Sequence, residues 1–466
     1  MRNPGNALSP FGLGLLLCTG TAATERIEYE PTWESLDKHP TPEWLMDAKL
    51  GIFVYGPNPT KAEWEAHQKL HGHKTNVVGH VLDYYPEWEA VQAWDQVPWN
   101  PDGLAQLAAD AGARYLVYTD GSFLLMRPSK VNDVEGSAFM RVGEQDRDYV
   151  GDVARAVRAR GLRFGLYTNL IHPGDHPQWL DSTKEAIDRY QPSTLWFDGN
   201  SLKDSAENMR TRELLAYYYN HSEKQDEVAA EDALGVYKRA TWGQRLVHGD
   251  WFRKEATEAA KEISDGYHVR YEEVTRQDGR SPTGRPGGVV NNYVEWLAHT
   301  ASHNGNLELT IWMNPRQMPR QKQILRQVGI WLEMNGEAIY DTRPWHDGRP
   351  QTQTTDGIDV RFTTKDDALY AILFEWPRGK SLPMSYERQV SHIGRFTLPH
   401  LRAGEGTTAT LLGRPGELEW HQEEKGLTVV LSSAETPPGW HHHTSAEIPC
   451  DHAFSFKIEP IPAWVE

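Results

Sequence analysis

Residues 148–168 read DYVGDVARAVRARGLRFGLYT, which places a helical pattern directly before a short apolar run. Over residues 148–160 the apolar side chains recur at three- and four-residue spacing, as in a helix that covers a sheet. Gly161 is the expected C-cap of this helix, and residues 163–168 then form a strand candidate. The stretch therefore predicts one helix–strand unit of an α/β protein.

The alternation of helix and strand continues on both sides of this unit. Strands are expected over residues 50–55, 114–119, 194–198 and 306–311, and helices over residues 101–111, 178–190, 212–219, 290–302 and 320–335. This alternation predicts a parallel sheet with crossover helices. At least five such units in about 300 residues favour a closed (β/α)8-like TIM barrel over an open sheet.

The pattern changes after Trp345. Residues 346–466 hold short alternating runs of apolar and polar side chains separated by turn residues, which is typical of an antiparallel β-sandwich. We therefore expect a (β/α) barrel over residues 24–345 and a C-terminal β-sandwich over residues 346–466. We expect the sandwich to buttress the barrel.

The composition restricts the class of protein. The 466 residues are 39% hydrophobic and 24% charged, enough for a large core, which excludes a wholly disordered chain. A net charge of −17 repels phosphate backbones, so we expect no nucleic-acid partner. The two cysteines, Cys18 and Cys450, exclude a disulfide framework and a cysteine-based zinc site.

Residues 1–23 have the organisation of a secretory signal peptide. Arg2 precedes an apolar run over residues 11–17, and Ala22 or Ala23 provides the cleavage site; the alternative is a disordered tail. The run is too short to span a bilayer, so we expect a periplasmic or extracellular protein without a membrane span. Leu17 precedes Cys18 where lipid attachment requires a small residue, which disfavours a lipoprotein anchor.

Polar residues close several of the expected strands. In a barrel, functional groups gather at the carboxyl ends of the strands. The residues at or just after these ends include Tyr55, Asp120, Asn169, Asp198 and Asn200. Asp198 follows three apolar residues, so its carboxylate would be held on a rigid strand between dry walls. The alternative is that Asp198 caps the following helix, and spacing alone supports both interpretations equally.

A second carboxyl group is required if the chemistry is glycoside cleavage. Retaining glycosidases hold two carboxyl groups about 5–5.5 Å apart. Residues 248–262 (HGDWFRKEATEAAKE) offer several, among them Glu255, Glu258 and Glu262, and spacing does not choose among them. Glu258 and Glu262 also fit a solvated helix face.

Four histidines, His67, His71, His73 and His80, cluster after the first expected strand. We interpret them as part of a polar surface loop, because no converging ligands indicate a metal site. Residues 280–288 lack the Lys-Ser/Thr pair that ends a phosphate-binding loop. We therefore expect neither a metal nor an organic cofactor.

Three segments carry a resemblance to a known family: residues 195–199 (LWFDG), 305–311 (GNLELTI) and 329–345 (GIWLEMNGEAIYDTRPW). They are similar to the nucleophile strand, the G-G-N-L-L-L-N-I strand and the barrel-closing segment of glycoside hydrolase family 29, the α-L-fucosidases. The likeness extends from about residue 31 to residue 345. It implies that Asp198, expected at the tip of the fifth inner strand, is the catalytic nucleophile.

The same resemblance implies Glu258 as the acid/base residue. Ile263 follows it at the family spacing, and residues 264–267 (SDGY) match the motif after it, although Thr257 stands where the family has Trp. Glu255 and Glu262 remain the alternatives. No metal or organic cofactor is required for this chemistry.

The chain departs from the family pattern around the sugar pocket. The first strand ends Val54-Tyr55-Gly56 instead of His-Trp-Gly. Residues 119–123 (TDGSF) lack the Lys and the two His residues that contact sugar hydroxyls in the family. A pocket built for one hydroxyl pattern penalises another, so the changes predict an altered sugar or lost turnover.

Substrate contacts are expected from residues close to the predicted strand ends. Tyr167 and Trp196 are expected to stack on the apolar face of the sugar. The full set of expected substrate-binding residues is Tyr55, Glu63, Trp64, Asp120, Tyr167 and Trp196.

The resemblance implies a retaining exo-glycosidase that removes terminal α-L-fucosyl residues from an oligosaccharide or glycoconjugate by double displacement. Two alternatives stay open: hydrolysis of another α-linked sugar such as an L-galactoside, and a non-catalytic sugar-binding relative. No oligomeric state follows from the sequence.

Overall fold

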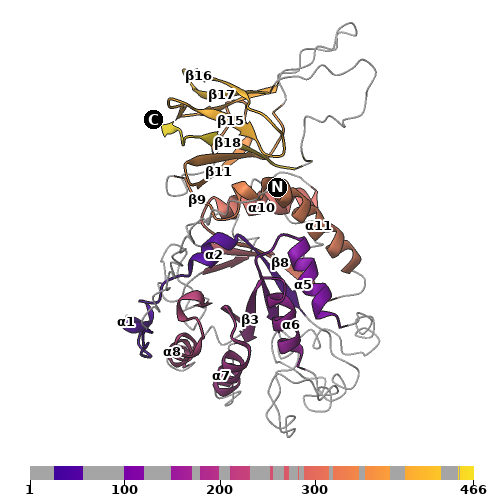
Figure 1. Ribbon diagram of the computed structural model, residues 1–466, viewed down its shortest axis with the longest axis vertical. Coiled ribbons are helices and arrows are strands. Elements are labelled where there is room, and N and C mark those ends of the chain that lie inside the picture. Colours follow the sequence, from indigo (N-terminus) through magenta and orange to yellow (C-terminus); the bar gives the residue numbers. More distant parts are fainter. Residues whose placement is uncertain are drawn as a thin grey trace, which may run out of the picture.

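The structure is a computed structural model in which a barrel of strands and helices carries a second, all-β domain next to α10 and α11 (Figure 1). It describes residues 26–55, 99–119, 148–169, 179–198, 210–230, 252–255, 267–271, 282, 288–313, 318–345, 352–377, 394–431, 450 and 452–465. The predicted signal peptide over residues 1–23 lies outside these ranges.

Eight parallel strands form the sheet of the first domain, in the order β5-β4-β3-β2-β1-β8-β7-β6. They are β1 (Leu50–Tyr55), β2 (Tyr115–Thr119), β3 (Arg163–Asn169), β4 (Thr194–Asp198), β5 (Ala229–Ala230), β6 (Phe252–Glu255), β7 (Tyr267–Tyr271) and β8 (Leu307–Trp312). Because β1 pairs with both β2 and β8, the order is that of a (β/α)8 barrel. The predicted barrel is therefore confirmed.

Two helices precede the first strand, the others follow or separate the strands along the chain, and helices surround the strands in space (Figure 1). They are α1 (Trp33–Leu36), α2 (Glu43–Ala48), α5 (Pro101–Asp110), α6 (Tyr149–Arg158), α7 (Trp179–Tyr190), α8 (Thr211–His221), α10 (Val289–Ala301) and α11 (Met318–Asn335), with short 3-10 turns η4 (Gln225–Glu227) and η5 (Gly336–Ala338). Each predicted helix is present, with bounds shifted by at most two residues.

Local chemistry explains where α6 begins and ends. The carboxylate of Asp148 accepts a hydrogen bond of 2.8 Å from the amide of Gly151, which caps the first turn. Gly161 adopts a φ of +72°, a left-handed conformation that glycine tolerates without a Cβ clash. The amide of Leu162 then donates to the carbonyl oxygen of Val157 at 3.2 Å and closes the helix.

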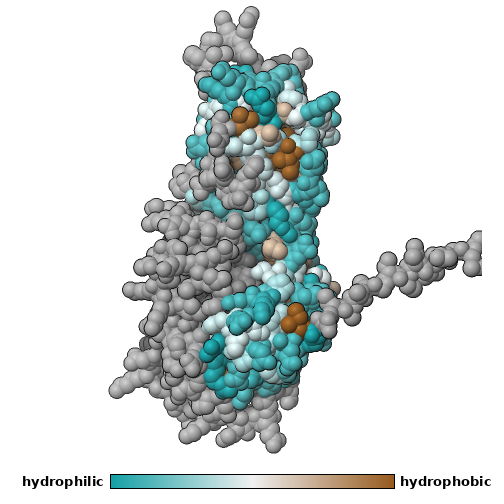
Figure 2. Space-filling model, turned by 90° about the vertical axis from the view of Figure 1, so that its left-hand side faces the viewer, coloured by the Kyte–Doolittle hydropathy of each residue, from teal (hydrophilic) through white to brown (hydrophobic). Residues whose placement is uncertain are grey.

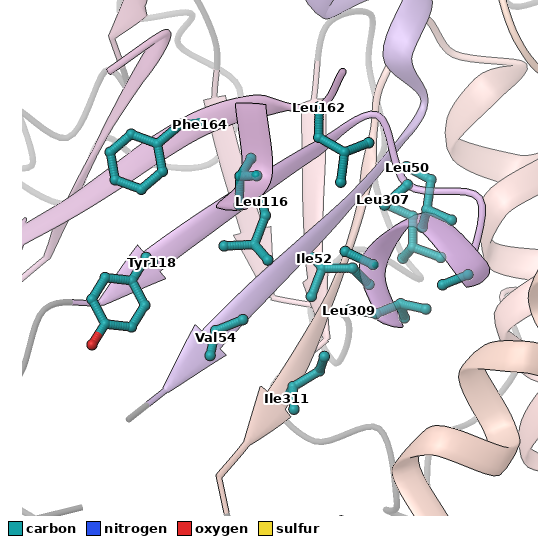
Figure 3. Packing of buried hydrophobic residues seen from close by; sticks show 14 of the residues in the cluster. Leu50, Ile52, Val54, Leu116, Tyr118, Leu162, Phe164, Leu307, Leu309 and Ile311 are labelled. Atoms are coloured by element: carbon teal, nitrogen blue, oxygen red, sulfur yellow. The ribbon is translucent and has the colours of Figure 1, made fainter. Parts of the chain in front are cut away.

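The side chains of the barrel strands alternate between two faces. One face packs against the helices: Leu50, Ile52 and Val54 of β1 belong to the same buried cluster as Leu307, Leu309 and Ile311 of β8 (Figure 3). The alternate residues belong to a separate buried cluster, which contains Phe53 of β1, Tyr115 of β2 and Trp196 of β4. This second cluster fills the barrel interior.

Three barrel strands were not expected. β5 has only two residues, both alanine, and β6 and β7 read FRKE and YHVRY. Such short or charged segments lack the apolar run that marks the other strands. The ladder also corrects one position, because β1, β2, β3 and β4 pair consecutively and Asp198 therefore ends the fourth strand, not the fifth.

The second domain contains two antiparallel sheets and a short strand pair. The larger sheet joins β10 (Thr352–Gln353), β11 (Asp359–Lys365), β12 (Ala368–Leu373), β18 (Phe454–Glu459) and β15 (Thr408–Leu411), and β9 (Arg343–Pro344) pairs with β11. The smaller sheet joins β13 (Gly394–Pro399), β17 (Gly426–Leu431) and β16 (Glu419–Glu423), and β14 (Leu401–Arg402) pairs with β19 (Ala463–Trp464).

The two antiparallel sheets face one another. The rings of Phe396 on β13 and Phe456 on β18 are 4.6 Å apart, and both side chains lie in one buried cluster. Apolar side chains from both sheets thus form a shared core, which makes the domain a β-sandwich as predicted.

Buried polar contacts join the sandwich to the barrel helices. Nε of Arg361 on β11 donates a hydrogen bond of 2.8 Å to Nδ1 of His299 on α10. Nε1 of Trp331 on α11 donates a hydrogen bond of 2.7 Å to the carbonyl oxygen of Ala453. The sandwich is therefore attached to the outer layer of the barrel through α10 and α11.

The described surface offers no large apolar area on the face seen in Figure 2, where hydrophobic residues form only small, separate groups. Among the described residues, the exposed large hydrophobic side chains are Ile27, Ile330 and Val465. Within the same ranges, no helix combines the length and the apolar character needed to cross a membrane.

Candidate active site

The carboxyl ends of β1 to β4 lie in register along one rim of the barrel. Tyr55 pairs with Thr119, Thr119 pairs with Tyr167, and Asn169 pairs with Asp198. Catalytic residues of (β/α)8 barrels come from this rim because the strands there open into the loops. The backbone of Asp198 is thus located where the chemistry of this fold is performed.

A layer of aromatic side chains lies directly beneath that rim. The rings of Tyr167 and Trp196 are stacked with centroids 5.1 Å apart, and the ring of Phe53 meets Trp196 edge-on at 5.0 Å. Phe53 also meets Tyr167 edge-on at 5.5 Å. Each ring lies two residues before a residue of the rim: Phe53 before Tyr55, Tyr167 before Asn169, and Trp196 before Asp198.

The burial of these rings changes their expected role. Trp196 is 0% exposed and Tyr167 is 2% exposed, so neither ring offers a free face to a sugar in this structure. Both rings were expected to stack on the substrate. Their position instead supports a role as the floor under the strand ends, where they hold the rim in place.

A buried carboxylate anchors this floor. Glu308 on β8 is 1% exposed, and its Oε1 accepts a hydrogen bond of 2.9 Å from Oη of Tyr115 on β2. Its Oε2 accepts a hydrogen bond of 3.1 Å from Nε1 of Trp196 on β4. Burial, followed by the charge of Glu308, raises the pKa of Tyr115 well above its usual value, so the tyrosine stays protonated as a donor.

Gly51 is the residue that allows Tyr115 to reach Glu308. Gly51 on β1 pairs with Tyr115 on one side and with Glu308 on the other, so it lies between the two partners. A Cβ at position 51 would overlap the tyrosine ring and lie 2.7 Å from its hydroxyl oxygen. The absent side chain therefore makes room for the phenol to cross β1.

Glu308 is not among the site residues predicted from the sequence. The signal was present, because a glutamate interrupts the apolar run of residues 305–311 at a position where the family pattern has leucine. Its partners are 193 and 112 residues away along the chain, so only the fold reveals the contact.

The remaining predicted site residues are placed only in part. Tyr55 and Asp198 are located by their backbones at the ends of β1 and β4, and Glu255 by its backbone at the end of β6. Outside the described residues lie Glu63, Trp64, Asp120, Glu258, Glu262 and the four clustered histidines.

Thr119 occupies the rim where the family pattern has a sugar-binding segment. Its Oγ1 donates a hydrogen bond of 2.9 Å to the carbonyl oxygen of Val54, and the residue is 2% exposed. The hydroxyl of Thr119 is thus used within the barrel wall.

Within the described ranges, no group of three or more His, Cys, Asp or Glu side chains is arranged to hold a metal ion.

Residues 16–337 match the family described as alpha-L-fucosidase, and residues 351–459 match the alpha-L-fucosidase C-terminal domain. The chain belongs to the α-L-fucosidase family. Tissue alpha-L-fucosidase of Rattus norvegicus is 30% identical to it over 97% of each chain. Alpha-L-fucosidase of Branchiostoma floridae is 28% identical over 96% of this chain and 99% of its own.

Solved structures of α-L-fucosidases share the fold. The structure of Thermotoga maritima alpha-fucosidase has a TM-score of 0.60 and 23% identity, covering 92% of this chain and 100% of that one. The same enzyme in complex with fucose also gives a TM-score of 0.60, at 22% identity, covering 92% of this chain and 99% of that one. Barrel and sandwich together are therefore the architecture of this α-L-fucosidase family member.

Proposed function

We propose that this protein is a retaining α-L-fucosidase that hydrolyses terminal α-L-fucosyl residues of oligosaccharides or glycoconjugates. The observation that carries the proposal is the position of Asp198 at the end of β4, on the catalytic rim of an eight-stranded barrel in a chain of this family. An aspartate there is held by a rigid strand and is adjacent to Asn169 of β3.

The proposed mechanism is a double displacement. Asp198 attacks the anomeric carbon while Glu258 donates a proton to the leaving oxygen, so the glycosidic bond breaks and a glycosyl ester forms. Glu258 then takes a proton from water, the resulting hydroxide attacks the anomeric carbon, and the ester bond to Asp198 breaks. The released sugar keeps the α configuration.

The acid/base assignment rests on the resemblance of the residues after Glu258 to the family motif, Ile263 and residues 264–267. Glu255 competes with it because it ends β6 on the same rim of the barrel as Asp198. Retaining catalysis requires carboxyl groups about 5–5.5 Å apart, so only one of the two glutamates can serve.

The proposed contacts to the sugar are Tyr55, Glu63, Trp64 and Asp120.

A second candidate substrate follows from Thr119. Its hydroxyl is already bonded to Val54, so this rim position does not supply the sugar contacts that the family pattern predicts there. Changed hydrogen-bonding groups change which hydroxyl pattern a pocket favours, and the second candidate is an α-L-galactoside, whose ring configuration matches that of L-fucose.

Hydrolysis of a panel of nitrophenyl glycosides tests both candidates. We expect release from the α-L-fucoside to exceed release from the α-L-galactoside, and NMR to detect α-L-fucose as the first anomer formed. Faster release from the α-L-galactoside would favour the second candidate. Binding of L-fucose without hydrolysis of any glycoside would identify a non-catalytic sugar-binding relative.

We also propose that residues 1–23 direct export, and that the mature chain consists of a barrel over residues 24–345 and a sandwich over residues 346–466. A small-residue site at Ala22 or Ala23 supports cleavage there. N-terminal sequencing of the protein recovered from its producing cells tests the proposal; a mature chain that still begins at Met1 would contradict it.

A further inference from the structure

Burial of the Glu308 carboxylate is energetically unfavourable at its position in the barrel. Glu308 is the second residue of β8, is 1% exposed, and its hydrogen-bond partners Tyr115 and Trp196 belong to the aromatic cluster of the barrel interior. A carboxylate loses its hydration when it is buried and is tolerated only where hydrogen bonds replace the lost water. A leucine, which the family pattern has at this position, would fill the same space without that cost.

The hydrogen bonds of Glu308 connect opposite walls of the barrel. In the strand order, β3, β2 and β1 stand between β4 and β8, so the bond from Trp196 to Glu308 crosses the interior. The second bond, from Tyr115, ties β2 to the same carboxylate. One side chain therefore links three strands in the barrel interior: Glu308 and Tyr115 lie near the starts of β8 and β2, and Trp196 lies two residues before the end of β4.

We propose that Glu308 is a positioning residue for the nucleophile. Through its hydrogen bond to Trp196 it fixes the indole two residues before Asp198 and thereby sets the height and direction of the end of β4. The ring of Phe53 meets the indole edge-on and the ring of Tyr167 stacks on it, so both rings also restrict its position. This inference rests on the proposed function, because it assumes that Asp198 performs the displacement.

The effect is expected on turnover rather than on substrate affinity. Asp198 follows Trp196 on the same strand, whereas the proposed sugar contacts lie on or after other strands, so relaxation around Trp196 is expected mainly to change the distance from the nucleophile to the anomeric carbon. A displacement of about 1 Å in a catalytic group can cost on the order of 100-fold in rate. We therefore expect Glu308→Leu to lower kcat by about 10- to 100-fold and to change KM by less than about threefold.

Two further variants separate positioning from simple packing. Glu308→Gln keeps the shape, since its amide oxygen accepts from Trp196 and its NH2 group donates to Oη of Tyr115, so we expect kcat within about threefold of the parent protein. Trp196→Phe removes the donor and should lower kcat as Glu308→Leu does. If both act through one bond, the double variant is no slower than Glu308→Leu alone.

The matched control is Glu295 on α10, a glutamate that is also 1% exposed but lies in the helical layer and accepts from Asn291. Glu295→Leu is expected to lower Tm and to leave kcat unchanged. Parent-like kcat in Glu308→Leu, or strictly additive losses in the double variant, would overturn the positioning role. If Glu308→Leu does not fold, parent-like kcat in Trp196→Phe has the same meaning.

A readout that does not depend on turnover keeps the two proposals distinguishable. In protein labelled with ¹⁵N-tryptophan, the indole resonance absent from Trp196→Phe is that of Trp196. We expect this resonance to move upfield in Glu308→Leu and to stay in place in Glu308→Gln. An unmoved resonance in Glu308→Leu would refute the inference, whereas a shifted resonance in a protein that hydrolyses no glycoside would refute only the proposed function.

Discussion

Nδ1 of His299 accepts the hydrogen bond of Nε of Arg361 at 2.8 Å, so the imidazole is neutral and carries its proton on Nε2. The two side chains are 2% exposed each and join α10 to β11. Burial, and then the charges of Arg361 and His303, hold the pKa of His299 well below its usual range. A proton on Nδ1 would point at an N–H group that is itself charged.

The contact between His299 and Arg361, which joins the barrel to the sandwich, should therefore contribute less to the free energy of unfolding in acid. In the unfolded chain the pKa of His299 has its ordinary value of about 6.5. Below that pH the imidazole is protonated in the unfolded state but not in the folded state, so protonation favours unfolding. Stability is complete above about pH 6.5 and declines below it by about 1.4 kcal/mol per pH unit, down to the folded pKa. We expect His299→Gln to flatten urea-unfolding free energies between pH 7.5 and pH 5.5.

The exposed histidine of β16 provides the comparison. Nε2 of His421 lies 3.0 Å from Oε1 of Glu419 on the surface, and because both side chains are exposed, replacement of His421 by Gln should change the free energy of unfolding little. An equally steep acid loss in His299→Gln and in the parent protein would show that His299 does not carry the effect.

Asp198→Ala is expected to lower kcat/KM on the nitrophenyl fucoside by at least about a thousandfold, because the covalent route requires a nucleophile. Addition of azide should restore part of the rate and yield the β-fucosyl azide. Asp188→Ala, which removes an exposed carboxylate of α7 bonded to Tyr217, should leave the rate unchanged. An Asp198→Gly protein with half of the parent activity would end the assignment.

The acid/base residue should be recognisable by its dependence on the leaving group. We expect Glu258→Ala to lower kcat/KM strongly on an oligosaccharide, which needs protonation of its leaving oxygen, and much less on an activated nitrophenyl fucoside. Glu255→Ala and Glu262→Ala are the matched variants. If the leaving-group dependence appears in Glu255→Ala instead, the residue at the end of β6 has the role.

Gly51→Ala is expected to destabilise the fold by about 1–3 kcal/mol, because the new methyl group overlaps the ring of Tyr115 and neither strand can move without breaking a ladder. Thermal unfolding measures the loss. Gly404→Ala is the control, since its nearest neighbour, Cγ of Pro460, lies at 4.0 Å. A Tm for Gly51→Ala equal to that of Gly404→Ala would mean that Tyr115 has room elsewhere.

Much of the architecture could be predicted because strong apolar periodicity marks its elements. The strand expected over residues 163–168 is observed as Arg163–Asn169, and the helix expected over residues 320–335 is observed as Met318–Asn335. β6 and β7 could not be found in this way, because charged residues such as Arg253 and Arg270 interrupt them. They are strands because their neighbours pair with them.

Candidate site residues could be selected from short segments of the sequence, but the contacts between distant strands could not be predicted in this way. The resemblance of residues 195–199 to the family's nucleophile strand singled out Asp198, whose neighbours on the strand are local in sequence. The interior layer depends on which strands meet, and the sequence does not contain that information in any short window. For this reason Trp196 was expected against the sugar, while the fold places its ring against Phe53 and Glu308.

The strand β18, residues Phe454–Glu459, lies between β12 and β15 in the larger sandwich sheet, although it is distant from both along the chain. The sheet therefore cannot close during synthesis until residue 459 has emerged from the ribosome. A polypeptide cut before residue 453 would leave two strands with open edges and Trp331 without its acceptor at Ala453. Nonsense mutations or proteolysis in this region should yield insoluble protein rather than a free barrel.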